Sequence, residues 1–328
     1  MSGPHVVVSR RTPGKALDDL IARYDTWVWE EDRTIPRALL LEQVRDAVGL
    51  YAMWTERIDQ ELLDAAPKLR TVSVMAVGVE NADMAACTAR GVSVGWIPEA
   101  VTEATADQAM ALLLALSRRI VDGHRYVREG RWRDWSPLVL MGHDVFGKTV
   151  GFVGFGRIGQ AIARRMRGFN MPILYHARHR RPAAEAELGA QHRDFDALLA
   201  EADIFVLILP LTPETHHLID AAAIAKMKPG ALIVNVARGG VLDPQALYDA
   251  LAAGYLGGAA LDVTEPEPIN PDSPLLTLDN CLIVPHTGTT TIETREQMTA
   301  LCIQNLVNGI EGRPLVACAN PEVQARRG

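Results

Sequence analysis

Three side chains in the last third of the chain have the types that reduction of a 2-oxo acid requires. Arg238 lies in NVARGG, Glu267 in LDVTEPEP and His286 in VPHTGT. An arginine holds a substrate carboxylate in a planar fork and polarises the neighbouring carbonyl. A histidine titrates near neutral pH, so it can donate a proton to the developing alkoxide, and a nearby carboxylate favours its protonated form. We therefore expect Arg238, Glu267 and His286 to be catalytic, with Arg238 also binding the substrate.

Each of these residues has an ordinary interpretation when it is taken alone. Arg238 could form a surface ion pair, Glu267 could be a loop charge, and His286 could lie in a capped turn. Their shared position favours the functional interpretation, because each follows a predicted strand. Ligands of open parallel sheets bind beyond the carboxyl ends of the strands.

A glycine-rich turn earlier in the chain predicts a dinucleotide site. Gly154, Gly156 and Gly159 form G-x-G-x-x-G between the apolar run TVGFV and the helical run QAIARRMRGF. The first glycine permits a tight turn, the second lets the backbone approach a pyrophosphate, and the third lets the helix pack on the strand. The motif alone is weak, but the strand before it and the helix after it supply the context that it needs.

The residues after the next predicted strand favour NADP(H) as the cofactor, with NAD(H) as the alternative. An Asp or Glu about twenty residues beyond the glycines normally binds the ribose 2′-hydroxyl of NAD. Here ILYHARHRRP places His176 and Ala177 at that point, followed directly by Arg178. A guanidinium grips a 2′-phosphate that a carboxylate would repel. A solvated basic loop is the competing interpretation.

Two further patterns carry no predicted function. Gly142–Thr149 matches a P-loop string, but it runs into a strand, whereas a P-loop opens a helix. His176 with His179, and His216 with His217, have spacings that suit metal ligands. No cysteine or carboxylate near either pair in sequence completes a ligand set, so we expect no metal site.

The elements that must position these residues form two series of alternating strands and helices. The expected fold class is α/β, with two Rossmann-like, doubly wound parallel-sheet domains and a cleft between them. Residues 1–101 with 288–328 are expected to form a substrate-binding (catalytic) domain, and residues 102–287 a dinucleotide-binding Rossmann domain. The expected strands are His5–Ser9, Thr26–Trp29, Val48–Met53 and Arg70–Val77, then Lys148–Gly154, Pro172–His176, Asp203–Leu209, Ala231–Val236, Gly258–Asp262 and Leu282–Val284.

Two long helical segments are expected to join the domains. Glu103–Gly130 has no internal proline and reads as one helical stretch, and Thr102 could cap its start. A second helix is expected near Glu293–Glu311.

The composition indicates the broad class of protein. The chain has 328 residues, 48% of them hydrophobic, and a formal charge of −7. The negative charge argues against a nucleic-acid partner, and no apolar run is long enough to cross a bilayer. The four cysteines have no paired spacing, and the start has no signal-peptide layout. We therefore expect a cytoplasmic protein with reduced thiols and no membrane partner.

These motifs together resemble the D-2-hydroxyacid dehydrogenase family, and most closely its glyoxylate/hydroxypyruvate reductases. The likeness rests on GFGRIG, NVARGG, LDVTEPEP and VPHTG in this order, and on the segment RWRDWSPLVLMGHDVFGKTVGFVGFGRIGQAIARR. It covers nearly the whole chain from about Arg70 onward. The resemblance implies NADPH-dependent reduction of glyoxylate or hydroxypyruvate to the D-hydroxy acid. In this family Arg238 would anchor the substrate, His286 would donate the proton, and Glu267 would be its partner.

The resemblance also implies contacts beyond these three residues. The expected cofactor-binding residues are Gly154, Gly156, Arg157, Ile158, Gly159, Arg178, Pro210, Val236, Asp262 and Gly288, with Asp262 near the nicotinamide carboxamide. The expected substrate-binding residues are Val77, Gly78, Met53, Trp135 and Arg238, with the backbone amides of Val77 and Gly78 receiving the carboxylate. Trp135 would point toward the active site of a partner subunit, so a homodimer is expected, with Glu103–Gly130 at its interface.

Departures from the family pattern bear on the substrate. Glu80 stands where the family usually has Asp, and Thr287 and Thr289 replace the more usual apolar residue and Ser.

The alternatives to glyoxylate or hydroxypyruvate reduction are a dehydrogenase for a larger 2-oxo acid and a non-catalytic, nucleotide-sensing corepressor or scaffold. A phosphite-oxidising relative would carry a lysine in Met75–Gly78, and this chain has none there.

Overall fold

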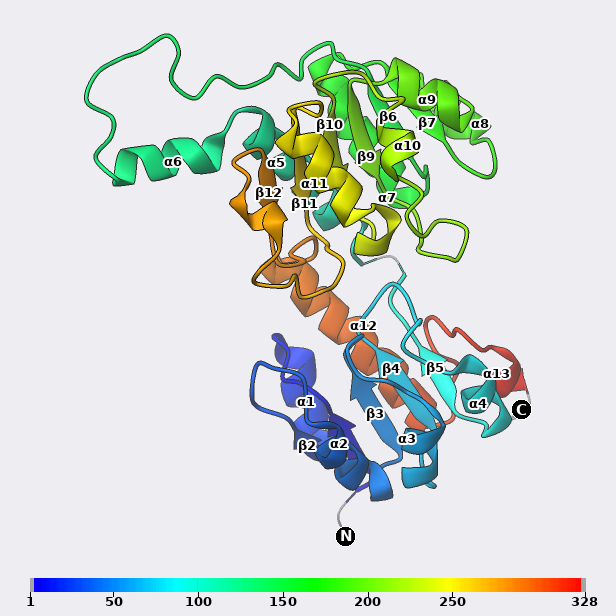
Figure 1. Cartoon of the computed structure of the whole chain (residues 1–328). Coiled ribbons are helices and arrows are strands. Elements are labelled where there is room, and N and C mark those ends of the chain that lie inside the picture. Colours follow the sequence, from blue (N-terminus) through cyan, green and yellow to red (C-terminus); the bar gives the residue numbers. More distant parts are fainter. Residues whose placement is uncertain (1–2, 99, 326–328) are drawn as a thin grey trace. The chain divides into compact units, whose positions relative to one another are not determined.

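The computed structural model describes residues 3–98 and 100–325. The chain divides into two compact units, Met1–Val101 with Thr290–Gly328, and Thr102–Thr289 (Figure 1). The second division lies two residues beyond the expected boundary. Parallel sheets form the centre of both units, as the sequence predicts, and each unit is described here by itself.

The first unit is built on a parallel sheet in the order β2-β1-β3-β4-β5. Its strands are β1 His5–Val8, β2 Asp25–Val28, β3 Gly49–Ala52, β4 Thr71–Val74 and β5 Ser93–Gly95. The short edge strand β5 was not among the expected strands, because a three-residue run between glycines carries little strand signal.

Helices cover both faces of this sheet. They are α1 Lys15–Arg23, α2 Arg37–Gln43, α3 Gln60–Ala65, α4 Met84–Ala89, α12 Ile292–Ile310 and α13 Glu322–Ala325, with the 3₁₀ helix η1 Val44–Asp46. One face packs a core with α2, α3 and α4. The other face meets α12 closely, since a Cβ on Gly309 would lie 2.4 Å from Thr71 Oγ1. Asp59, Asp83 and Thr291 cap three of these helices with their side chains.

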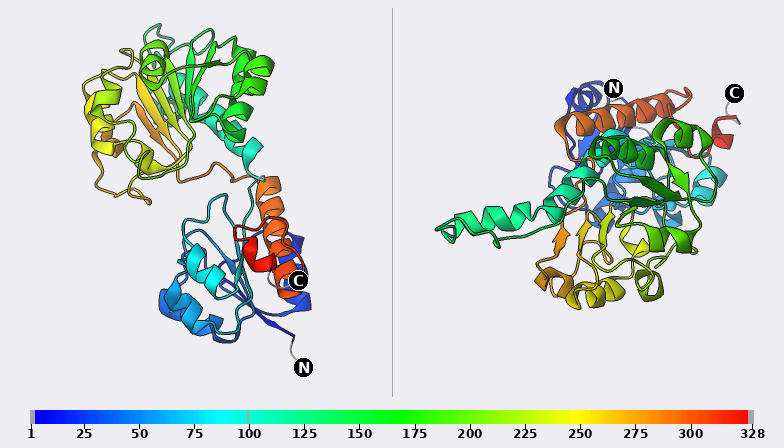
Figure 2. Two further views of the ribbon diagram at one scale, coloured as in Figure 1. Left: turned by 90° about the vertical axis from the view of Figure 1, so that its right-hand side faces the viewer. Right: turned by 90° about the horizontal axis from the view of Figure 1, so that it is seen from above.

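The second unit has a parallel sheet in the order β12-β11-β10-β9-β6-β7-β8 (Figure 2). Its strands are β6 Val150–Val153, β7 Ile173–His176, β8 Gln191–His192, β9 Ile204–Leu207, β10 Leu232–Asn235, β11 Gly258–Leu261 and β12 Cys281–Ile283. Counted from β6 this is the dinucleotide-binding order 3-2-1-4-5-6 with one added strand. The direction of winding changes between β6 and β9, and ligands of such sheets bind at that point.

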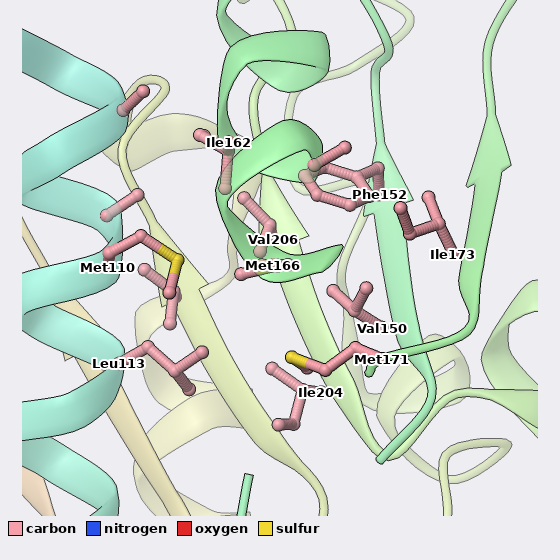
Figure 3. Packing of buried hydrophobic residues seen from close by; sticks show 14 of the residues in the cluster. Met110, Leu113, Val150, Phe152, Ile162, Met166, Met171, Ile173, Ile204 and Val206 are labelled. Carbon is pink, nitrogen blue, oxygen red and sulfur yellow. The ribbon is translucent and has the colours of Figure 1, made fainter. Parts of the chain in front are cut away.

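Two apolar cores lie on opposite faces of this sheet. The helices are α5 Thr102–Ser117, α6 Ile120–Arg128, α7 Arg157–Met166, α8 Pro182–Leu188, α9 Phe195–Glu201, α10 Ala221–Ile224 and α11 Pro244–Ala252. On β6, Phe152 packs with α5 and α7, whereas Val153 packs with α9, α10 and α11. Figure 3 shows Met110 and Leu113 of α5 and Ile162 and Met166 of α7 on the same side as Phe152. Strands buried on both faces explain the continuous apolar runs of the sequence.

The expected single helical stretch Glu103–Gly130 is wrong, because the helix breaks after Ser117. Arg119 has φ 50°, in the left-handed region. The carbonyl of Ser117 accepts a hydrogen bond from the amide of His143 at 2.7 Å, instead of serving a continuing helix. Thr102 is the first helical residue of α5, not a residue before it. Helix α6 therefore starts a segment of its own, which extends from the body of the unit (Figure 1).

None of the helices within residues 3–98 and 100–325 combines the length and apolar character needed to cross a membrane.

Candidate active site

The glycine turn follows β6 and has the close approaches that its motif predicts. Gly154 has φ 92°, and a Cβ there would lie 2.3 Å from the carbonyl oxygen of Ile208. Any other residue would be strained by both effects. Among the described residues, none would come within 4 Å of a Cβ on Gly156, so the backbone there is open to a ligand. A Cβ on Gly159 would lie 3.2 Å from the Gly154 oxygen, which shows how closely α7 packs against the turn.

The start of α7 is suited to an anion. Within residues 3–98 and 100–325, no side chain caps the helix at Gly156, and the first turn of α7 holds no acidic residue. The amide groups at a helix N-terminus carry a partial positive charge and commonly bind phosphates. The backbone at Arg157 and Ile158, together with the open space at Gly156, therefore fits the pyrophosphate of a dinucleotide.

Two of the arginines that follow β7 differ in their contacts. Arg180 Nη2 donates to Glu185 Oε2 at 2.6 Å, and the Tyr175 hydroxyl donates to Glu185 Oε1 at 2.6 Å. These hydrogen bonds, that of Arg180 first, lower the pKa of Glu185 to about 2. Arg178 is exposed and, among the described residues, makes no hydrogen bond or ion pair. Arg178 is thus available to a ligand at the end of β7, whereas Arg180 is already paired.

His286 and Glu267 meet directly. His286 Nδ1 lies 2.5 Å from Glu267 Oε1, and the two side chains are 37% and 23% exposed. The backbone of His286 has φ 53°, a left-handed conformation that is uncommon for a residue with a side chain. Local backbone strain of this kind is held by surrounding contacts and is often found at active sites.

Asp262, at the end of β11, supplies those contacts. Its side chain is buried, with 3% of the residue exposed. Asp262 Oδ1 accepts the amide of Thr287 at 2.7 Å, and Oδ2 accepts the amide of Gly288 at 2.9 Å. A Cβ on Gly288 would lie 2.8 Å from Asp262 Oδ2, so only glycine fits easily. Asp262 therefore holds the turn that carries His286, a contribution that the sequence motif did not reveal.

Arg238 follows β10, and its backbone is held by Asn235. Asn235 Nδ2 donates to the Arg238 carbonyl at 3.1 Å, and the guanidinium donates from Nη1 to the Ala237 carbonyl at 2.9 Å. A Cβ on Gly239 would lie 1.9 Å from the Thr264 oxygen. The segment after Arg238 thus runs directly against the chain that leads to Glu267. Asn235 was also missed from the sequence, although it opens the NVARGG motif.

The remaining expected cofactor residues lie at the same end of this sheet. Pro210 follows β9, is exposed, and accepts the Thr215 hydroxyl at 2.8 Å. Val236 directly follows β10 and is 7% exposed. The turn at Gly288 is held further by α5, because Gln108 Nε2 donates to Thr287 Oγ1 at 3.0 Å. These positions bring the loops after β9, β10 and β12 to one edge of the sheet.

Three expected substrate residues lie in the first unit. Val77 and Gly78 belong to the loop after β4, where a Cβ on Gly78 would lie 2.0 Å from Glu80 Oε2. The Glu80 carboxylate thus lies over Gly78. Met53 follows β3, and its amide donates to the buried Glu56 carboxylate at 2.5 Å. The contact of these residues with a substrate stays a prediction.

Trp135 is not a core residue, because it is 80% exposed. It lies in the segment of residues 120–146, which we call the projecting segment. This segment carries many exposed apolar side chains, and large exposed apolar groups commonly mark interaction sites. They are Ile120, Val121, Val127, Trp132, Trp135, Leu138, Val139, Met141 and Phe146.

A carboxylate that is distant in sequence lies beside the histidine pair at 216–217. Glu265 lies against both rings, 3.2 Å from His216 Nε2 and 2.5 Å from His217 Nε2. Partial burial raises the pKa of Glu265, but hydrogen bonds to His217 and His216 outweigh it, and the net shift is downward.

Comparison with known proteins identifies the family. Residues 110–288 match the family model described as "D-isomer specific 2-hydroxyacid dehydrogenase, NAD binding domain". The chain belongs to this family. As a D-2-hydroxyacid dehydrogenase family member it is an NAD(P)-dependent oxidoreductase, which agrees with the resemblance seen in its motifs.

Relatives of the dehydrogenase match over almost its full length. It is 46% identical to a glyoxylate reductase of Pyrococcus furiosus over 324 residues, covering 98% of this chain and 96% of the relative. A solved structure of the TT0316 protein from Thermus thermophilus is 44% identical, with a TM-score of 0.92 and coverage of 96% and 99%. An NADPH-dependent glyoxylate/hydroxypyruvate reductase from Sinorhizobium meliloti, solved with NADP and malonate, is 30% identical, with a TM-score of 0.83 and coverage of 97% of each chain.

Proposed function

We propose that this dehydrogenase reduces glyoxylate or hydroxypyruvate to the D-2-hydroxy acid with NADPH. The observation that carries the proposal is the contact between His286 Nδ1 and Glu267 Oε1, at the sheet edge that also holds the glycine turn and Arg238. The substrate class is supported by the similarity to proteins named glyoxylate reductase. A bound nicotinamide supplies the hydride.

Arg238 is assigned to the substrate carboxylate. Its guanidinium offers parallel N–H donors that match a carboxylate, and the charge stabilises negative charge on the adjacent carbonyl oxygen. Asn235 hydrogen-bonds to the backbone carbonyl of Arg238, so the guanidinium is attached to an ordered segment at the end of β10. Ordered donors stabilise a transition state without reorganisation.

His286 is assigned the proton transfer to the substrate oxygen. Because Glu267 bonds to Nδ1, the proton is delivered from Nε2. The Glu267 carboxylate stabilises the imidazolium and orients the ring, in the manner of carboxylate–histidine pairs in other enzymes. Asp262 keeps the turn at His286 in place through the amides of Thr287 and Gly288.

The preference for NADPH is assigned to Arg178. No acidic residue ends β7, where NAD-binding folds place a carboxylate for the ribose hydroxyls. Arg178 is exposed there, and a guanidinium grips a phosphate in bidentate fashion. The pairing of Arg180 with Glu185 favours Arg178 over Arg180 as the residue that contacts the 2′-phosphate.

The protein is further proposed to act as a homodimer. The projecting segment carries an apolar surface that a second copy would cover, and the family resemblance assigns the same segment to the subunit interface. In that assembly Trp135 would approach the partner's active site.

The test is oxidation of NADPH and NADH, run side by side, with glyoxylate, hydroxypyruvate, pyruvate and phenylpyruvate. We expect the fastest turnover with NADPH and the first two acids. Faster turnover with phenylpyruvate would instead assign a larger substrate, and preference for NADH would refute the role of Arg178. Absence of turnover with all four acids would favour a nucleotide-sensing protein without catalysis.

Arg238→Ala separates substrate anchoring from cofactor binding. We expect a large loss of kcat/KM for glyoxylate with an unchanged Kd for NADPH, measured by fluorescence titration. Equal losses in the two quantities would argue against Arg238 as the substrate anchor.

A further inference from the structure

A second group of side chains with metal-binding chemistry lies outside the proposed active site. It consists of His216 and His217, in the loop after β9, and Glu265, in the loop after β11. Their nitrogen and oxygen atoms lie within 4.8 Å of one another. The two imidazole rings stack, with centroids 3.9 Å apart, and each Nε2 faces a different oxygen of the same carboxylate. Ligand-type atoms from three side chains thus converge on one small volume.

The loop that carries the histidines is well ordered by hydrogen bonds. The amide of His217 donates to the Gly240 carbonyl at 2.7 Å, and the amide of Ile219 donates to the Val241 carbonyl at 3.0 Å. The Thr215 hydroxyl donates to the Pro210 carbonyl at 2.8 Å and accepts the amide of Thr212 at 2.7 Å. His217 itself has φ 50°, so its direction is set by the surrounding backbone.

Glu265 is held against the same backbone. A Cβ on Gly240 would lie 3.1 Å from Glu265 Oε1, so the carboxylate packs closely over this glycine. The side chains of His216, His217 and Glu265 are 49%, 34% and 36% exposed. The group is therefore prearranged, yet water and ions reach it from solvent.

The ligand types select a divalent transition-metal ion. Imidazole nitrogen with one carboxylate oxygen suits Zn²⁺ and its neighbours, whereas Mg²⁺ and Ca²⁺ take oxygen ligands. With metal–ligand bonds of about 2.0–2.1 Å, two ligands of a tetrahedral ion lie roughly 3.3 Å apart. The distance of 3.2 Å between His216 Nε2 and Glu265 Oε1 already matches that spacing. His217 Nε2, at 2.5 Å from Oε2, would have to move outward slightly as the ion takes the place of the bridging proton.

We propose that His216, His217 and Glu265 form a binding site for one divalent transition-metal ion, with water completing its coordination. Three protein ligands leave an open position, as in sites where zinc keeps a bound water. The ion would link the loop after β9 to the loop that carries Glu267, two residues beyond Glu265. The proposal does not depend on the dehydrogenase reaction, because none of these three side chains is assigned to substrate or cofactor.

The competing explanation is that the histidines only donate hydrogen bonds to Glu265 and tie the two loops together. The experiment that distinguishes the two is calorimetric titration of the full chain with Zn²⁺, after removal of any polyhistidine tag. Three variants each remove one ligand: His216→Ala, Glu265→Gln and His217→Asn. Asparagine is chosen at 217 because it tolerates the left-handed backbone. His124→Ala is the matched control, since His124 is an exposed histidine outside the group.

We expect one Zn²⁺ per chain in the wild type and in His124→Ala. Loss of an outer-shell partner alone weakens metal binding by about 10- to 100-fold, so loss of a ligand should weaken it at least as much. Equal affinity in the wild type and the three ligand variants would overturn the proposal, as would the absence of binding.

A second readout does not depend on the variants folding. In the wild type, histidine ring signals followed by nuclear magnetic resonance should show two rings changing together on addition of one equivalent of Zn²⁺. Ring signals that stay unchanged while Zn²⁺ binds would place the ion elsewhere, for example on a cysteine, and would equally overturn the proposal.

Discussion

The carboxylate of Asp262 accepts the backbone amide of Gly288 at 2.9 Å, which fastens the end of β11 to the turn that carries His286. Its other oxygen accepts the amide of Thr287 at 2.7 Å. The position of the proposed proton donor therefore depends on a buried carboxylate that need not touch the substrate.

Replacement of Asp262 should loosen this turn. Asp262→Asn keeps one acceptor oxygen and places an N–H₂ group opposite a backbone amide, so one hydrogen bond is lost. Loss of a hydrogen bond to a charged, buried group costs about 1.5–3 kcal/mol. We expect the free energy of unfolding in urea to fall by this amount and kcat to fall with it. Asp272→Asn, at an exposed aspartate, is the control. Unchanged stability and unchanged kcat would show that the Asp262 contacts do not order the turn.

Replacement of Glu267 should affect the chemical step. Glu267→Gln keeps a hydrogen-bond acceptor for His286 Nδ1 but removes the charge that stabilises the imidazolium. General acid catalysis accelerates a reaction by about 10²- to 10⁴-fold. We therefore expect kcat/KM for glyoxylate to fall by a factor that approaches this range, while the Kd for NADPH stays the same. Glu201→Gln is the control, because Glu201 pairs with Arg193 on the surface. A variant with wild-type kcat/KM would remove Glu267 from the mechanism.

Replacement of Arg178 should change the choice of cofactor. Arg178→Ala is expected to lower kcat/KM with NADPH by about tenfold or more, since a hydrogen bond to a charged group is worth about 1.5–3 kcal/mol. The value with NADH should hardly change. Arg180→Ala removes the same charge from the same loop, but Arg180 is paired with Glu185. If both variants lose NADPH preference equally, the net charge of the loop sets the preference and not a contact by Arg178.

The hydrogen bonds to Glu185 should make part of the stability depend on pH. The pKa of Glu185 in the folded chain is lowered from 4.5 to about 2. A lowered folded-state pKa contributes stability above the unfolded value, and this contribution is lost as the pH falls toward the folded value. Glu185→Gln should therefore be less stable than the wild type above pH 4.5, with the difference shrinking as the pH approaches 2. Urea unfolding across this range is the measurement. A difference that is constant with pH would mean that Glu185 contributes by packing alone.

Truncation of Trp135 should weaken the proposed dimer. Tryptophans at the centre of an interface commonly contribute about 2 kcal/mol or more, so the dissociation constant of Trp135→Ala should rise accordingly. Sedimentation analysis over a range of concentrations measures it. Val316→Ala, at an apolar residue that is 55% exposed in the first unit, is the control. A wild-type chain that sediments as a monomer would refute the dimer.

The residues of the candidate site were predictable where chemistry and local structure coincide. Each of the three catalytic candidates, Arg238, Glu267 and His286, follows a strand that is predicted by an apolar run. Because the strands are parallel, their carboxyl ends lie at one edge of the sheet, and so do these residues. The glycine turn is equally local, since Gly154, Gly156 and Gly159 lie within six residues.

What escaped prediction depends on contacts between distant segments. The end of α5 is set by the amide of His143, far along the chain from Ser117, and no local signal marks it. Glu265 and His217 are 48 residues apart in the sequence, so the spacing of residues could not predict that they form one group with His216. Strands β5 and β8 have only three and two residues, too few for a periodic pattern.

The order of the segments also bears on how the chain folds during synthesis. The unit Thr102–Thr289 is continuous, whereas the first unit needs residues from both ends of the chain. Helix α12, which covers one face of the β1–β5 sheet, leaves the ribosome only after the whole continuous unit has been made. The nascent chain should therefore complete the nucleotide-binding unit while the N-terminal sheet still exposes an apolar face. That face is where chaperones would be expected to bind, and a chain truncated before α12 should aggregate although all five strands are present.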